Sequence, residues 1–219
     1  MRSDGVALAL TALPVLLTTV LLRLPWSIAA LPPPYRDFAA YAAANWLTFA
    51  LVLRLVGRQR LRDLGLRVRP TGRAVGAALL GFVAGLVVYA VVSALLARFG
   101  LPPVRGMQFA SPTALQGAAL FLCVVVTAAF CEEVFFRVLW IGVLRRRMAL
   151  WRAGAVSIAA FAAIHYPYFG LGGVIFISVW AILPLCLFVV FGDLTAPLLM
   201  HALNNTFAYL VVPLLLRTG

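Results

Sequence analysis

The chain has 219 residues, of which 64% are hydrophobic and 11% are charged, and its mean hydropathy is +1.06. Several apolar runs approach or exceed the roughly 20 residues that a membrane-spanning helix needs, so the composition excludes an ordinary soluble domain. The net charge of +12 comes from 18 arginines without a lysine, and most of them cluster in loops between apolar runs, which indicates membrane topology and speaks against nucleic-acid binding.

Apolar segments follow one another along the chain, and each predicts a membrane helix. They cover residues 6–22, 38–55, 74–97, 113–144, 153–165, 171–191 and 195–216. The first has no obvious small-residue cleavage site and is followed by further spans, which favours a helix over a signal peptide. We therefore expect an all-α, polytopic transmembrane bundle of about seven spans, roughly six to eight.

The arginines predict the orientation of this bundle. Those in the loop 57–73 and in the segment 145–152 are expected to face the cytoplasm with Arg2, because cytoplasmic loops carry the excess of positive charge. Only Arg23, Arg36, Arg98, Arg105 and Arg217 fall on the opposite side. The N-terminus is thus predicted to be cytoplasmic. Leu61, Leu64 and Leu66 alternate with arginines, which fits either an interfacial segment on anionic membrane lipids or a solvated basic loop.

Two adjacent glutamates, Glu132 and Glu133, lie inside the apolar segment 113–144 and are the only glutamates of the chain. An ionisable side chain at bilayer depth costs roughly 2.5–3.5 kcal/mol or more, and it normally faces a partner or a polar cavity. The pair therefore predicts a functional site. Cys123, Cys131 and Cys186 also lie in apolar runs without CxxC spacing, so we expect buried thiols, and neither disulfides nor a cysteine metal cage.

The only two histidines are expected to reach the same depth as the acids. Glu132 precedes the arginines at 145 by about 13 residues and His165 follows Arg152 by about as many, which places both roughly 20 Å from one membrane edge. His201 follows Asp193 by about eight residues, or roughly 12 Å, which tilt and uncertain helix ends can reconcile. One buried polar centre is therefore predicted to contain every Glu and His.

Helical spacing separates the roles of the two glutamates. Glu133 and Arg137 are four residues apart and share a helical face, so we expect a buried ion pair. Glu132 is rotated by about 100° from Glu133, and no basic residue stands three or four positions away, which leaves it for chemistry. In the last span, His201 and Asn205 also lie four apart with Asn204 on roughly the same side, and the amide supplies donors suited to an oxyanion.

Three motifs in this order, Glu132-Glu133-x-x-x-Arg137, Phe161-x-x-x-His165 and His201-x-x-x-Asn205, resemble those of the CAAX protease and bacteriocin-processing (CPBP, or Abi) family of intramembrane endopeptidases. The resemblance implies a catalytic helical core at residues 111–219, preceded by N-terminal transmembrane helices at 1–110 with the basic cytoplasmic loop 57–73. It also implies catalytic roles for Glu132, His165, His201 and Asn205, with structural support from Glu133, Arg137 and Phe161.

The mechanism implied by the resemblance is attack of an activated water on a peptide carbonyl. Glu132 with His165 would polarise the water, and His201 with Asn205 would hold the oxyanion. We expect no metal cofactor, although Glu132, His165 and His201 would be the ligands of a zinc ion in the alternative metalloprotease reading. The sequence contains no His-Glu-x-x-His motif, no Gly-x-Ser nucleophile and no pair of intramembrane aspartates.

The sequence is also compatible with two other classes of function. Buried Glu and His chains also serve as proton relays, so a proton- or ion-coupled transporter is the alternative, although we find no inverted repeat. A non-catalytic membrane chaperone or immunity protein is the third. For a protease, the expected substrate is a membrane-associated peptide, lipidated or carrying a C-terminal sorting signal. The absence of lysine favours a prokaryotic cytoplasmic membrane.

Overall fold

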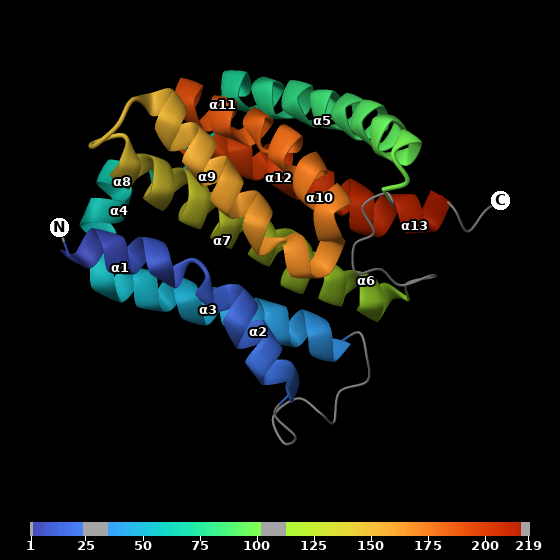
Figure 1. The fold of residues 1–219 in the computed structure, drawn as a ribbon, viewed down its shortest axis with the longest axis horizontal. Coiled ribbons are helices and arrows are strands. Elements are labelled where there is room, and N and C mark those ends of the chain that lie inside the picture. The colour runs from blue at the N-terminus through green and yellow to red at the C-terminus, as the bar shows by residue number, and fades with distance from the viewer. Residues whose placement is uncertain (1, 24–34, 102–112, 216–219) are drawn as a thin grey trace.

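The computed structural model describes residues 2–23, 35–101 and 113–215, with the side chains of residues 2–4 left aside. These parts of the chain contain helices and no strand (Figure 1). Five helical stretches are long and apolar enough to cross a membrane, and two apolar helices are shorter. The predicted polytopic helical bundle is confirmed, whereas the orientation of its termini stays a prediction.

The described α-helices have the following order and bounds. They are α1 (Arg2–Leu10), α2 (Leu13–Arg23), α3 (Tyr35–Val56), α4 (Arg58–Leu64), α5 (Gly72–Arg98), α6 (Ala114–Leu120), α7 (Thr127–Glu133), α8 (Gly142–Leu144), α9 (Leu150–Ile164), α10 (Tyr166–Trp180), α11 (Ile182–Phe191), α12 (Thr195–Thr206) and α13 (Val212–Leu215). Three π-helical stretches join some of them, namely η1 (Phe121–Val126), η2 (Val134–Ile141) and η3 (Phe207–Val211).

The first predicted span, residues 6–22, is wrong as a single helix. The chain turns at Thr11 between α1 and α2, where the Thr11 hydroxyl donates to the Leu8 carbonyl at 2.7 Å. Pro14 is the second residue of α2. Proline has no N–H to donate to the preceding turn and fits only the first turn of a helix, so a continuous helix through this position is disfavoured.

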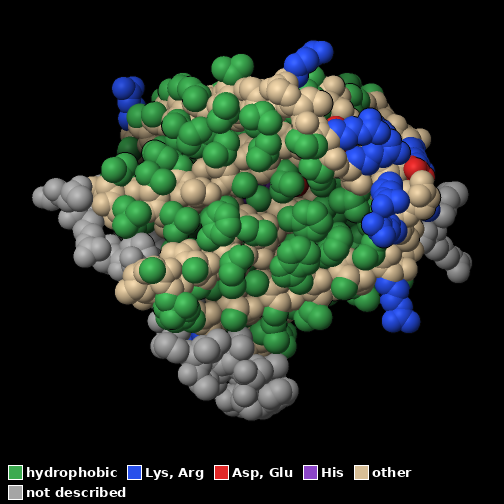
Figure 2. Space-filling view, turned by 180° about the vertical axis from the view of Figure 1, so that it is seen from behind, with side chains coloured by type: hydrophobic (Ala, Val, Ile, Leu, Met, Phe, Trp, Pro, Cys, Tyr) green, Lys and Arg blue, Asp and Glu red, His purple; other side chains and the backbone are tan. Residues whose placement is uncertain are grey.

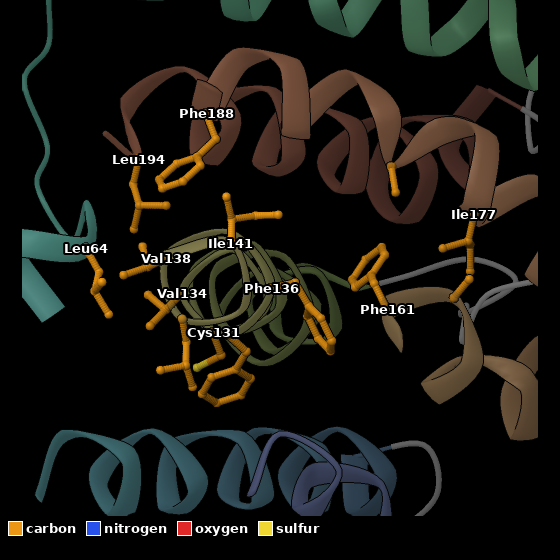
Figure 3. Close-up of a cluster of buried hydrophobic side chains, with 14 of the residues drawn as sticks. Leu64, Cys131, Val134, Phe136, Val138, Ile141, Phe161, Ile177, Phe188 and Leu194 are labelled. Atoms are coloured by element: carbon orange, nitrogen blue, oxygen red, sulfur yellow. The ribbon is translucent and has the colours of Figure 1, made fainter. Parts of the chain in front are cut away.

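The segment with both glutamates forms one continuous helix from α6 to α8 at the centre of the bundle. Its N-terminus is closed by a capping box between Thr113 and Gln116. All residues from Val134 to Leu139 are buried. Seen along this helix, Val134 and Val138, Phe136, and Ile141 point outward on different sides, with other helices around them (Figure 3). The buried charges of Glu132, Glu133 and Arg137 fit this central position, because charged side chains at bilayer depth face the bundle interior.

The next two predicted spans lack the loop that we expected between residues 165 and 171. Helix α9 ends at Ile164 and α10 begins at Tyr166, so His165 is the single residue that joins them. Pro167 lies in the first turn of α10, where its missing N–H costs nothing. Gly170 interrupts the helix instead, with φ 62° and ψ −164°, a conformation that glycine adopts readily.

The basic loop 57–73 contains α4 and lies at the same end of the bundle as α8 and the N-terminus (Figure 1). Arginine side chains gather at one end of the molecule, next to a face covered by hydrophobic side chains (Figure 2). Leu61 and Leu64 are 0% and 1% exposed and belong to the protein core. Neither the interfacial nor the solvated interpretation fits these two leucines, because both pack in the core between the helices.

Gly142 allows this close contact between α4 and the central helix. A Cβ atom at Gly142 would lie 2.8 Å from Cδ2 and 2.9 Å from Cβ of Leu64. We expect Gly142→Ala to lower the Tm in detergent, because overpacking costs about 1–3 kcal/mol and outweighs the gain in helix propensity of about 1 kcal/mol. Gly76→Ala is the control, since a Cβ there meets nothing within 4 Å. A rise in Tm for both variants would contradict this packing.

Two remaining expectations concern single residues. The three cysteines are free, as expected, and Cys131 is buried. Cys186 on α11 is exposed, so the prediction of a buried thiol is wrong at this position. An apolar run predicts membrane insertion and does not say which helical face meets other helices. Arg105, Arg217 and the end of the last predicted span at residue 216 lie outside the described residues.

Candidate active site

A cavity of about 400 Å³ opens beside the central helix and contains the predicted catalytic residues. Glu132 from α7, His165 from the junction of α9 and α10, and His201 from α12 all line it. Phe161, Asn204 and Asn205 line the same cavity. Segments far apart in sequence therefore meet at one polar centre, as the depth estimate predicted. Glu133 and Arg137 do not line the cavity, although they contact residues that do.

Glu132 presents its carboxylate to both histidines. Its Oε1 lies 3.8 Å from His165 Nε2, and its Oε2 lies 3.7 Å from His201 Nε2. These distances are too long for direct hydrogen bonds. The side chain of Glu132 is 8% exposed, whereas that of His165 is 15% exposed. The two carboxylate oxygens thus face two different imidazoles across short gaps at the cavity wall.

Both imidazole rings are anchored through Nδ1. His165 Nδ1 lies 2.7 Å from the Phe161 carbonyl oxygen, and His201 Nδ1 lies 2.8 Å from Glu133 Oε1. A carbonyl and a carboxylate oxygen only accept hydrogen bonds, which assigns a proton to Nδ1 in both rings. Each Nε2 faces a different oxygen of Glu132, and it carries a lone pair when the ring is neutral.

Aromatic rings hold the two histidines in these orientations. His165 contacts the Phe161 ring edge-on at 4.7 Å and stacks with Phe169 at 5.9 Å. His201 contacts Trp180 edge-on, with ring centroids 5.0 Å apart. Phe161 also contacts the central helix, as Figure 3 shows beside Phe136. The Phe161 position of the second motif therefore has two contacts with His165, through its carbonyl and through its ring.

Glu133 forms the ion pair with Arg137 that its spacing predicts. Glu133 Oε2 lies 3.3 Å from Arg137 Nε, and the two side chains are 0% and 2% exposed. The Arg137 guanidinium also lies 4.7 Å over the Phe161 ring. The other oxygen of Glu133, Oε1, accepts from His201 Nδ1 at 2.8 Å, a contact that the spacing did not predict, and the supporting role of Glu133 stays a prediction. Helix geometry shows the near partner of a side chain but not the distant helix that contacts it.

Sequence reasoning missed Tyr41, which belongs to α3. Its hydroxyl donates a hydrogen bond of 2.7 Å to Glu132 Oε1, and its ring lines the cavity. We expected no basic partner for Glu132 within its own helix, and this hydrogen bond comes from a different helix. A polar tyrosine in the second apolar segment was a visible signal. No local spacing links it to a residue 91 positions further along the chain.

The donor chemistry of the site is compatible with zinc, but the described geometry does not form a metal centre. Glu132 and the Nε2 atoms of both histidines are suitable donors, and both Nδ1 atoms have the oxygen partners that zinc-binding histidines usually have. Within residues 2–23, 35–101 and 113–215, no group of three or more His, Cys, Asp or Glu is arranged to hold an ion.

Comparison with known families gives a result for the segment that contains all three motifs. Residues 114–207 match the family model of the Rce1-like, type II CAAX prenyl endopeptidases. This Rce1-like match confirms the resemblance to the CAAX protease family over the acidic helix, α9 to α11 and α12. No curated protein and no solved structure gave a significant match to the chain. The described helices indicate a multi-pass membrane protein, and its segment 114–207 is similar to CAAX-type proteases.

Proposed function

We propose that this chain is an intramembrane endopeptidase in which Glu132 activates water for attack on a peptide carbonyl. One observation carries the proposal. Glu132, His165 and His201 meet at a cavity wall, where each carboxylate oxygen of Glu132 lies 3.7–3.8 Å from the Nε2 atom of one histidine. A water molecule that donates one hydrogen to Glu132 and the other to His165 Nε2 satisfies this arrangement. The Rce1-like segment supports the same reaction class.

The proposed hydrolysis uses Glu132 as the general base. The water oxygen attacks the carbonyl carbon while one proton passes to the Glu132 carboxylate, and His165 Nε2 holds the second hydrogen. Collapse of the tetrahedral intermediate breaks the C–N bond, and Glu132 returns the proton to the leaving nitrogen. Such positioned proton transfer contributes about 10²–10⁴-fold to a rate.

His201 and Asn205 are proposed to stabilise the oxyanion. The Asn205 amide supplies N–H donors from α12, and the protonated His201 ring donates from Nε2 because Nδ1 is occupied by Glu133. The buried Glu133 carboxylate stabilises the charge on this ring. Asn204 lines the same cavity and is an additional polar group for the substrate.

The proposed substrate is a peptide at the membrane, either lipidated or ending in a sorting signal. The cavity wall is largely aromatic and aliphatic, with Leu86, Tyr89 and Phe176 among its residues. Such a wall accepts apolar groups, while the polar residues gather around Glu132. We place the enzyme in the cytoplasmic membrane of a prokaryote, with lipids around its apolar face. The catalytic core is proposed to occupy residues 111–219, with residues 1–110 as supporting helices.

The test compares peptides from cells that produce the wild-type protein or Glu132→Gln at equal levels. Mass spectrometry of membrane and secreted fractions should find cleaved peptides that require the wild-type protein. The same new termini in both samples would contradict the proposal. Asp63→Asn controls for loss of a carboxylate elsewhere, because Asp63 is exposed and lies on α4.

The metal alternative gives a separate prediction. We favour hydrolysis without a metal; if zinc is bound, Glu132, His165 and His201 would hold it, and it would supply a Lewis acid for the water. Purified enzyme should contain much less than about one zinc ion per chain, and it should keep its activity after treatment with a strong chelator. A zinc enzyme would lose its activity under the same treatment. Stoichiometric zinc that is lost together with activity would establish the alternative.

A further inference from the structure

We propose that Tyr41 is a positioning residue for the catalytic carboxylate, so that the active site is completed by a helix outside the Rce1-like segment. This inference rests on the proposed function of Glu132. Tyr41 lies on α3, whereas the matched segment begins at residue 114. Its hydroxyl reaches Glu132 Oε1 at 2.7 Å, which is a short hydrogen bond typical of a charged acceptor.

This hydrogen bond is what fixes the Glu132 side chain. Among the described residues, Tyr41 provides the one direct hydrogen bond to this carboxylate, because both histidine Nε2 atoms lie beyond 3.5 Å. A glutamate has three rotatable side-chain bonds and would otherwise be free to turn within the cavity. With Oε1 held by Tyr41, Oε2 is directed to His201. The two gaps in which water can bind therefore depend on the tyrosine hydroxyl.

A second polar contact sets the register of α3 against the central helix. Trp46 Nε1 donates to Thr127 Oγ1 at 3.1 Å. Helix α3 and the central helix run in the same direction, from the right of Figure 1 to its left, so these two hydrogen bonds cross between the helices. At 1.5 Å per residue, Tyr41 and Trp46 are about 7.5 Å apart along α3, and Thr127 and Glu132 are equally far apart along the central helix. Trp46 also stacks on Phe130 at 5.4 Å, which adds an apolar contact to the same pairing.

The first experiment measures catalysis by Tyr41→Phe, which keeps the ring and removes the hydroxyl. The probe is a synthetic copy of a peptide that the wild type cleaves and Glu132→Gln does not. We expect kcat to fall about 10–100-fold per folded enzyme, with KM within about twofold, because small displacements of a catalytic group are costly. Tyr166→Phe is the matched control, since Tyr166 is 60% exposed and does not line the cavity.

The second experiment tests the contact without a substrate. In a double-mutant cycle followed by thermal unfolding, Tyr41→Phe should lower Tm in the wild type but not in Glu132→Leu, where the hydroxyl has lost its acceptor. A kcat within twofold of wild type would overturn the positioning role, even if the cycle shows coupling. Equal Tm changes in both backgrounds would overturn the contact itself. Cleavage by Glu132→Gln would overturn the proposed function instead, while the cycle would still report on Tyr41.

Discussion

Glu132→Gln is expected to remove peptide cleavage while the protein stays folded in the membrane. Gln cannot take the proton of the attacking water, so the loss should be about 10²–10⁴-fold in kcat. Its amide is nearly the same size as the carboxylate, and its carbonyl oxygen can still accept from the Tyr41 hydroxyl that now binds Oε1. Cleavage rates and Tm of purified protein in detergent measure the two effects separately.

The histidine variants should behave differently from one another. His165→Ala removes a ring anchored by the Phe161 carbonyl and should chiefly reduce activity. His201→Ala should reduce activity and stability together, because it leaves Glu133 Oε1 without its 2.8 Å partner. Cleavage near the wild-type rate by Glu132→Gln would contradict the proposed general base, and unfolding by this variant would show that the carboxylate is mainly structural. Asp63→Asn should match the wild type in both measurements.

Glu133→Gln is expected to be the most destabilising of the conservative changes at the site. Arg137 would keep its buried charge, and breaking a buried pair by removal of one partner typically costs roughly 3–5 kcal/mol. A Gln carbonyl can accept from His201, but its amide group then faces the Arg137 guanidinium, where two donors oppose each other. In a protein of this size we expect a fall in Tm on the order of 10 °C.

Combining Glu133→Gln with Arg137→Met tests this explanation. The double variant removes the unpaired cation and keeps an acceptor for His201, so it should recover much of the lost stability. Since Glu133 also orients His201, activity should return only in part. Additive losses of Tm in the double variant would show that the pair is not the cause. A stable but inactive Glu133→Gln, together with an unfolded Glu132→Gln, would mean that the two carboxylates have the opposite roles.

Local periodicity was sufficient to predict much of the fold and part of the site. Apolar length predicted the helices, since a bilayer requires about 20 residues per span. The i, i+4 spacing predicted the pair of Glu133 and Arg137, because neighbours on one helix meet regardless of what surrounds the helix. The three motifs predicted the similarity to CAAX proteases that the family match of residues 114–207 shows, and a depth estimate predicted that Glu132 and the histidines meet.

The tertiary structure decided which partners the site residues have. The hydroxyl of Tyr41 reaches Glu132 across 91 positions of sequence, and His201 reaches Glu133 across 68. Both contacts depend on how separate helices pack, a relation that no periodicity within one helix contains. The same reason explains why Leu61 and Leu64 turn toward the protein rather than the lipid. Sequence determined the helices and their own faces, whereas only packing between helices determined which side chains each face meets.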